Sequence, residues 1–391
     1  MNKKKIAIIA HGCRTGGTLV STPNLLRAIK NVAEHEEILL VCSEGCGYEQ
    51  IELPSGSRRY IYKWGHSPVV RQWFERVTLP KIIDAYNPDV IFGPGNIGLT
   101  KPKAPQAILI RIAYLFYDRK KYYPNATIKE RMRLAALRNQ VKTSLVNGTN
   151  LVFVQTPVVR ERVAAAFDYP ITQIKVLRLP PPADIRFPSD DAVPSVFRSG
   201  ENDFNILIMT PYMTHRNPDV LIPLCRNYCR QLREQHIRFI TTITSGEHRY
   251  AERFLKNISR YGFEDIILNV GELSRSEVTK YLTNSQLLWL PTMIETLCFP
   301  FLEAMALGTS VMAPDLDFAR YVCGNAAIFY DPWDIDSIFR DIMLVRENAA
   351  LRKELVEKGK AQLGDRKIFA GSWEETATDL IHELRTLAEQ V

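Results

Sequence analysis

Short apolar runs, separated by amphipathic or polar stretches, recur along the whole chain. Runs of about four to eight apolar residues are typical of buried parallel strands, and a 3.6-residue apolar period is typical of helices. The pattern predicts strands over residues 4–10, 37–42, 87–92, 107–112, 151–156, 175–179, 204–209, 238–244, 287–290 and 309–313. It predicts helices over residues 24–32, 157–167, 218–224, 276–282, 300–307, 337–345, 349–363 and 373–390. Strands that alternate with helices indicate an α/β protein with parallel sheets.

The length and the proline content of the chain divide it into domains. With 391 residues, the chain exceeds what one hydrophobic core usually serves. Five prolines and many polar residues lie between residues 180 and 203, which is typical of a linker. We therefore expect an N-terminal domain over residues 1–183, a linker over 184–203, a C-terminal domain over 204–368 and a final helical segment over 369–391.

The segment 291–315 contains two carboxylates that could serve one ligand. Glu295 falls in the loop after the predicted strand 287–290, and ligands of open α/β sheets bind at the carboxyl ends of strands. Glu303 falls about one turn inside a helix that can begin at Pro300 and end at Gly308. Its carboxylate is a good acceptor for the hydroxyls of a diol such as ribose.

Backbone amides lie between these two glutamates. The amides of Leu297, Cys298 and Phe299 precede the helix, where free N–H groups and the helix dipole favour a phosphate group. A phosphate site beside a diol site indicates a nucleotide diphosphate that lies across the helix start. The alternative is an ordinary helix with two solvated glutamates.

This segment resembles the glutamate–seven–glutamate motif of retaining GT-B glycosyltransferases of family GT4, the glycosyltransferase group 1 family. The common form is E-G-F-G-x-x-x-x-E-A-M-A-x-G-x-P-V, and residues 295–311 read E-T-L-C-F-P-F-L-E-A-M-A-L-G-T-S-V. Both glutamates, the Ala-Met-Ala run and Gly308 are present. The two glycines after the first glutamate are replaced, so we expect a stiffer loop.

The resemblance implies an α/β protein with the GT-B fold, in which two Rossmann-like domains face a central cleft and the C-terminal helix crosses back to the N-terminal domain. It also implies transfer of a hexose from a nucleotide-diphosphate sugar to a glycan or lipid-linked acceptor, with retention of configuration and without a metal or other cofactor.

The resemblance further implies which residues contact the donor. Arg216 takes the position of a lysine that holds the diphosphate, whereas no basic residue occupies the preceding arginine position near Pro211 or Tyr212. Gly16 and Gly17 resemble the glycine loop between the first strand and helix. The implied catalytic residues are Glu295 and Arg216. The implied nucleotide-sugar contacts come from Gly16, Gly17, Arg216, Glu295, Thr296, Leu297, Cys298, Phe299 and Glu303, and the base contacts from Val270 and Leu273.

Positive charge is concentrated in residues 101–142, which contain eleven Lys and Arg but two acidic residues, a net charge of +9 against +7 for the whole chain. Aromatic residues are interleaved with these charges, a combination that suits an anionic membrane surface. The alternative is a solvated helix face. We expect a cytoplasmic protein with peripheral contact at the inner membrane face.

Several other classes of protein are disfavoured. No run of about 18 apolar residues exists, and residues 6–10 are too short for a signal-peptide core. The turn between the first predicted strand and helix, residues 11–18, lacks the G-x-G-x-x-G pattern, which disfavours NAD, and no cluster with metal-ligand spacing accompanies the seven cysteines. We expect no nucleic-acid partner, because the positive charge is local and no reader motif is present.

Two further functions remain open. A nucleotide-sugar epimerase can share the same fold and the same donor site. A degenerate transferase that serves as a binding subunit is favoured modestly by the absent basic residue near Pro211 and by the replaced glycines after Glu295.

Overall fold

The computed structural model describes residues 3–390 except 15, 64–67, 123–126, 189–192, 198–199, 201 and 247–248. The chain forms two compact units. The first comprises residues 1–117, 127–182 and 369–391, and the second comprises 118–126 and 183–368. The C-terminal segment therefore belongs to the unit that contains the N-terminus.

The sheet of the first unit is entirely parallel. Over the described residues its seven strands have the order β3-β2-β1-β4-β5-β6-β7. The strands are β1 (Lys4–Ile9), β2 (Glu36–Ser43), β3 (Arg58–Tyr62), β4 (Val90–Gly93), β5 (Gln106–Leu109), β6 (Leu151–Val154) and β7 (Ile174–Val176). The strand order reverses at β1, which pairs with β2 on one side and with β4 on the other.

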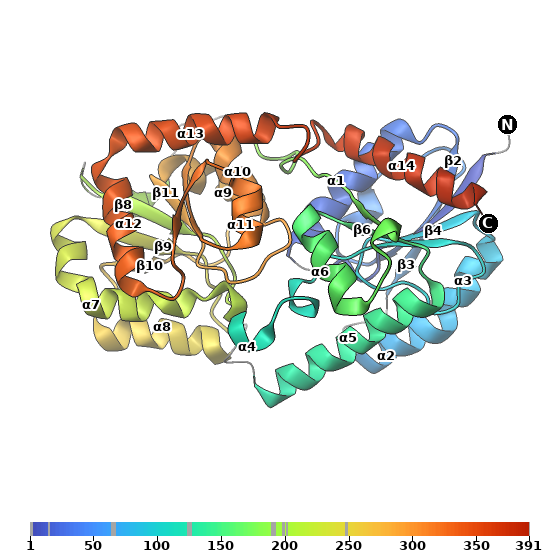
Figure 1. The fold of residues 1–391 in the computed structure, drawn as a ribbon, viewed down its shortest axis with the longest axis horizontal. Coiled ribbons are helices and arrows are strands. Elements are labelled where there is room, and N and C mark those ends of the chain that lie inside the picture. The colour runs from blue at the N-terminus through green and yellow to red at the C-terminus, as the bar shows by residue number, and fades with distance from the viewer. Residues whose placement is uncertain are drawn as a thin grey trace. The chain divides into compact units, whose positions relative to one another are not determined.

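Helices cover both faces of this sheet. They are α1 (Gly17–Val32), α2 (Pro68–Trp73), α3 (Leu79–Tyr86), α5 (Ile128–Gly148), α6 (Pro157–Phe167) and α14 (Trp373–Glu389), with a π-helical turn at Phe74–Thr78. One core cluster joins Ala7 and Ile9 of β1 to Phe74, Leu79 and Ile83. α14 packs beside α1 (Figure 1).

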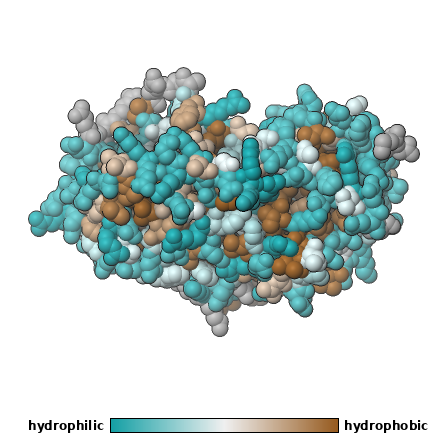
Figure 2. Space-filling model, turned by 45° about the horizontal axis from the view of Figure 1, so that its top comes forward, coloured by the Kyte–Doolittle hydropathy of each residue, from teal (hydrophilic) through white to brown (hydrophobic). Residues whose placement is uncertain are grey.

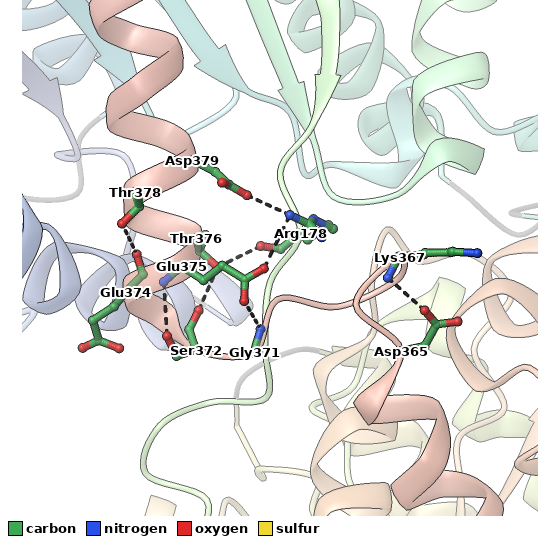
Figure 3. Close-up of polar contacts among 10 residues, drawn as sticks. All are labelled: Arg178, Asp365, Lys367, Gly371, Ser372, Glu374, Glu375, Thr376, Thr378 and Asp379. Atoms are coloured by element: carbon green, nitrogen blue, oxygen red, sulfur yellow. Dashed lines mark hydrogen bonds and ion pairs between the residues drawn. The ribbon is translucent and has the colours of Figure 1, made fainter.

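Polar contacts fix the start of α14 within the first unit. Ser372 caps the helix by accepting a hydrogen bond from the Glu375 amide at 3.1 Å. Arg178, which follows β7, pairs with Asp379 at 3.0 Å, and its carbonyl oxygen accepts a hydrogen bond from Thr376 at 2.8 Å (Figure 3). These contacts hold the last helix against the segment that ends the N-terminal part of the unit.

The sheet of the second unit is also parallel. Over the described residues its six strands have the order β10-β9-β8-β11-β12-β13. The strands are β8 (Phe204–Ile208), β9 (Ile237–Thr241), β10 (Ile267–Asn269), β11 (Leu287–Trp289), β12 (Ser310–Pro314) and β13 (Ala327–Tyr330). The order reverses at β8, so that β8 and β11 are neighbours although about eighty residues separate them.

Apolar side chains alternate between the two faces of this sheet, as the strand period requires. Phe204, Ile206 and Ile208 of β8 contribute to a core cluster with residues of three helices, α7 (Leu221–Glu234), α8 (Arg249–Tyr261) and α12 (Ile335–Glu347). The remaining helices of the unit are α4 (Arg119–Tyr122), α9 (Arg275–Asn284), α10 (Phe299–Leu307), α11 (Asp317–Cys323) and α13 (Ala349–Gly364). α10 packs between α9 and α13.

The observed units differ from the predicted domain boundaries in one segment. Residues 118–122, predicted within the first domain, lie with the second unit. The reason is an aromatic contact: the ring of Tyr122 lies 6.2 Å from that of Trp333, and the Lys121 ammonium lies 5.2 Å from the Trp333 ring centre. Tyr123, one of the aromatics of the basic region, is outside the described residues.

Most predicted strands are present within one to three residues, but the apolar pattern missed three. β3, β10 and β13 are all edge strands, and β3 is only partly buried because two of its residues are the charged Arg58 and Arg59. The pattern also did not delimit α3, α5 and α8. α5 in particular has buried side chains only at Val141, Ser144 and Leu145 and therefore shows no continuous apolar stripe.

The surface is largely hydrophilic. On the face drawn in Figure 2, brown patches are separated by teal residues. In the part of the chain that the structure describes, every helix is too short or too polar to span a bilayer.

Candidate functional site

The carboxyl ends of β8 and β11 present the first two predicted site residues. Arg216 lies in a short 3₁₀ helix, Thr214–Arg216, after β8, and Glu295 lies in the loop after β11. These strands are neighbours where the strand order reverses, which is where open α/β sheets bind ligands. The Met293 amide donates to the His215 carbonyl at 2.7 Å and so joins the two loops.

Arg216 and Glu295 face each other. The Nε atom of Arg216 lies 3.2 Å from Oε1 of Glu295, and the two side chains are 22% and 15% exposed. Nε makes no well-aligned hydrogen bond, so the contact is chiefly Coulombic. Nη1 of Arg216 donates to Thr210 Oγ1 at 3.1 Å, and Thr292 Oγ1 donates to Glu295 Oε1 at 3.4 Å. Burial raises the pKa of Glu295, while the charge of Arg216 and the hydrogen bond from Thr292 act in the opposite direction.

Each member of this pair has one polar atom without a partner in the described part of the chain. Within the described residues, no hydrogen bond or ion pair involves Nη2 of Arg216 or Oε2 of Glu295. A guanidinium nitrogen can bind an anionic oxygen, and a carboxylate oxygen can accept from a hydroxyl. The pair can therefore hold a ligand that carries both groups.

A small cavity lies beside the pair. Its volume is ≈ 10 Å³, room for about one water molecule. The lining residues are Thr210, Arg216, Leu290, Pro291, Thr292, Glu295, Cys298 and Pro300. Because Pro300 belongs to the first turn of α10, the positive end of that helix also reaches the cavity. The structure thus brings Arg216, Glu295 and Cys298 to one place.

α10 begins and ends as its sequence predicts, within one residue. Phe299 and Pro300 occupy its first two positions, and Gly308 ends it with φ 74°, as a left-handed C-terminal cap. Cys298, immediately before the helix, has φ 59° and ψ 72°. Left-handed backbone costs an L-residue roughly 1–2 kcal/mol, and the resemblance places glycine at this position. Cys298, which stands where the motif has glycine, is therefore a strained position.

Two amides before α10 are available to a ligand. Within the described residues, no hydrogen bond uses the amide of Leu297 or Cys298. Thr296, Leu297 and Phe299 are all buried, and Phe299 is the most exposed of the three, at 9%. The arrangement agrees with a helix start that offers free N–H groups, which is the feature expected of a phosphate site.

Glu303 does not line the cavity but lies on α10 with its own arginine. Its side chain is 3% exposed, and its Oε1 lies 2.9 Å from Nη1 of Arg275. Arg275 also binds Asp184 through Nε at 2.8 Å and Nη2 at 3.0 Å. Burial raises the pKa of Glu303, and the charge of Arg275 opposes that rise. Burial by itself would lower the pKa of Arg275, but its two carboxylate partners raise it overall.

Arg275 was not among the predicted site residues, although the sequence contained a signal for it. Ser274 caps α9 in a capping box with Glu277, as predicted, so Arg275 is the first residue of that helix. A cation is unfavourable at the positive end of a helix dipole unless an anion compensates it. Here Asp184 and Glu303 supply that compensation.

The predicted base-contact residues lie elsewhere in the second unit. The Val270 amide already donates to the Thr241 carbonyl at 2.9 Å. Val270 lines a different cavity, of ≈ 550 Å³, with Ser195, Leu255 and Ile258 among the other lining residues. Leu273 is half-buried and lies two residues before Arg275. The structure therefore does not bring Val270 to the cavity beside Arg216.

The glycine loop lies in the first unit, after β1. Gly16 has φ 56° and ψ −142°, a backbone conformation that glycine adopts readily but that is strained for other residues. α1 begins at the next residue, Gly17. Nearby, Nε2 of His11 lies 3.0 Å from Oε1 of Glu75, which also accepts from Arg71 Nε at 2.7 Å. The ring of His11 packs on Phe74, so His11 contributes to the core beneath the loop.

The basic region contains an exposed helix. α5 has Ile128 and Met132 exposed by 79% and 69%, although both are large apolar residues. Lys129 and Arg133 are exposed on the same part of the helix. The first half of α5, residues 128–140, buries no side chain fully.

A family model described as "Glycosyl transferases group 1" matches residues 191–362. This span contains β8 to β13 together with Arg216, Arg275, Glu295 and Glu303. No curated protein sequence is significantly similar to the chain.

Solved structures resemble the whole chain at low sequence identity. Sucrose-phosphate synthase from Thermosynechococcus elongatus is 16% identical, with a TM-score of 0.76 and coverage of 100% of both chains. WaaG, a glycosyltransferase involved in lipopolysaccharide biosynthesis, is 14% identical, with a TM-score of 0.71 and coverage of 96% of this chain and 99% of WaaG. Alr3699/HepE from Anabaena, solved with UDP and glucose, is 15% identical, with a TM-score of 0.68 and coverage of 98% and 100%. These similarities confirm the predicted GT-B fold.

Substitution of Cys298 by glycine tests the strain before α10. We expect Cys298→Gly to change the free energy of unfolding by less than about 1 kcal/mol, because the relief of left-handed strain offsets the lost thiol contacts. The matched control is Cys323→Gly, since Cys323 is also buried but lies in α11 without a positive φ. That change should cost about 2 kcal/mol in urea unfolding. Equal losses in the two variants would contradict the strain at Cys298.

Proposed function

We infer that the protein transfers a hexose from a nucleotide-diphosphate sugar to a glycan or lipid-linked acceptor, because residues 191–362 match the model of the group 1 glycosyltransferases and the Arg216–Glu295 pair can hold such a donor. The bond between the anomeric carbon and the diphosphate breaks, and a bond to an acceptor oxygen forms. The acceptor proton passes to the leaving diphosphate. We propose that the configuration of the sugar is retained, as the resemblance of residues 295–311 implies.

The observation that carries this proposal is the Arg216–Glu295 pair at the start of α10. Arg216 offers a free Nη2 and Glu295 a free Oε2 among the described residues, beside unused amides of Leu297 and Cys298. A departing diphosphate gains negative charge, which a guanidinium and a helix start stabilise. Donors that are already in place need no reorganisation during the reaction, and such electrostatic stabilisation is usually the largest catalytic contribution.

The remaining donor contacts follow from the same placement. Glu295 would hold sugar hydroxyls and orient the anomeric carbon, while Glu303 would accept hydrogen bonds from the ribose hydroxyls. Gly16 and Gly17 would let the loop of the first unit approach the diphosphate closely. Arg216 and the helix start would supply the positive charge that stabilises the leaving group, so we propose a metal-independent reaction with no other cofactor.

The acceptor side of the proposal involves the surface of α5. An exposed helix with two large apolar residues among basic ones can lie at the boundary of an anionic bilayer. Each Lys or Arg near such a surface contributes about 1 kcal/mol of attraction. We propose that this helix, within the basic region 101–142, brings the protein to a membrane that holds a lipid-linked acceptor.

A thermal-shift screen against UDP-, GDP-, ADP- and dTDP-sugars tests the proposed donor class, because a ligand that binds the native state raises the melting temperature. The donor that binds is then incubated with and without candidate acceptors. Transfer requires an acceptor, whereas an epimerase converts the sugar of the donor by itself.

The epimerase remains a candidate because the putative UDP-N-acetylglucosamine 2-epimerase from Listeria monocytogenes is similar in structure, with 12% identity and a TM-score of 0.60. Donor binding without either reaction would indicate a binding subunit, and no binding of any donor would contradict the proposal.

Replacement of the two glutamates should separate binding from turnover. Glu303→Ala removes the proposed ribose acceptor, so we expect nucleoside diphosphate affinity to fall by about tenfold or more. Glu295→Ala should leave that affinity within a fewfold but lower kcat by at least about a hundredfold, since Glu295 would act on the sugar. Calorimetry with the nucleoside diphosphate and a transfer assay measure the two effects. Undiminished nucleotide binding in Glu303→Ala would count against its assignment.

Vesicle sedimentation tests the membrane surface. We expect binding to vesicles with phosphatidylglycerol but not to pure phosphatidylcholine vesicles, and loss of binding as salt rises, because exposed charges are screened. The double variant Lys129→Gln/Arg133→Gln should weaken binding by roughly tenfold or more. The matched control, Lys358→Gln/Lys360→Gln on the exposed surface of α13, removes the same charge and should bind as wild type. Equal weakening in both variants would show that net charge alone is responsible.

A further inference from the structure

We propose that Arg275 is a positioning residue for the nucleotide: it fixes Glu303 so that one carboxylate oxygen is presented to the ribose hydroxyls of the donor. This inference rests on the proposed function, in which Glu303 is the ribose acceptor. It adds a residue that neither the motif nor the resemblance identified.

All three guanidinium nitrogens of Arg275 contact a carboxylate. Nε and Nη2 bind the two oxygens of Asp184 at 2.8 and 3.0 Å, and Nη1 binds Oε1 of Glu303 at 2.9 Å. A planar guanidinium held at both oxygens of one carboxylate has little freedom to rotate. Asp184 therefore aims the third nitrogen of Arg275 at Glu303.

The contact with Arg275 leaves the two oxygens of Glu303 in different states. Oε1 is committed to Arg275, whereas Oε2 has no hydrogen-bond partner among the described residues and is not sealed from solvent. The side chain is 3% exposed, so the surrounding helices restrict its other movements. A single open oxygen on a fixed carboxylate is a directional acceptor for a hydroxyl, which is what a ribose site requires.

The charges around Glu303 also require Arg275. The charged groups that act on Glu303 are Arg275, at the start of α9, and Asp184, in the segment before β8. In the described part of α11, α13 and β12, which pack against α10, no charged side chain forms an ion pair with it. Without Arg275, a buried carboxylate would keep only another negative charge nearby and would accept hydrogen bonds poorly.

Binding of matched nucleotides to matched variants tests the inference. Calorimetry measures UDP, GDP and ADP, and the 2′,3′-dideoxy counterpart of whichever binds to the wild type. Arg275→Gln should weaken binding of the ribonucleotide by about tenfold or more and leave the dideoxy nucleotide within about twofold, because the lost contact is with the missing hydroxyls. Asp184→Asn, a milder change at an exposed residue, should show the same selectivity with a smaller loss.

The control is Arg233→Gln, which breaks an exposed bidentate pair of the same unit, with Asp265 at 2.7 and 3.0 Å, and should bind both nucleotides as wild type. Equal weakening of both nucleotides by Arg275→Gln and by Asp184→Asn would show a merely structural role and overturn the inference. So would unchanged ribonucleotide affinity in both variants. If the wild type binds none of the three nucleotides, the inference fails, and the proposed function fails with it only if no dTDP-sugar binds either.

Discussion

The neutralisation of two buried carboxylates by two arginines is the constraint on which the site depends. A carboxylate removed from water is costly unless an opposite charge and hydrogen bonds replace the lost solvent. Glu295 meets this requirement through Arg216 and Glu303 through Arg275. Neither arginine is adjacent in sequence to its partner, so the fold must deliver each one to the right place. The loops after β8 and β11, and the start of α9, therefore have little freedom to vary.

Strand order makes this delivery possible. Parallel strands all end at the same edge of a sheet, and at the reversal point the loops of two neighbouring strands diverge and leave a crevice. In the second unit that point is β8 with β11, which supply Arg216 and Glu295. α10 then begins directly after the Glu295 loop, and its dipole adds to the positive potential of Arg216. Arg216, Glu295 and the positive end of α10 are thereby directed to one small cavity.

The chemistry of the site follows from oxygens of Glu295 and Glu303 that form no hydrogen bond or ion pair within the described residues. One oxygen of each glutamate is bound to an arginine or lies against it, and the other is open among the described residues. Because the paired oxygens fix the orientation of the open ones, the acceptors are oriented before a ligand arrives. Such preorganisation lowers the cost of binding and of charge development.

The sequence by itself determined the alternation of strands and helices, the ends of α10 and the capping box of α9, because each is set by residues within a few positions of one another. A motif of fixed spacing also predicted Glu295 and Glu303 as site residues, and the family resemblance of a separate turn predicted Arg216. Only the tertiary structure decided that Arg275 and Asp184, 91 residues apart, meet at Glu303, because strand order brings distant segments together and no local pattern records it. For the same reason the sequence did not reveal the edge strands β3, β10 and β13, each of which is defined by its pairing with a neighbouring strand.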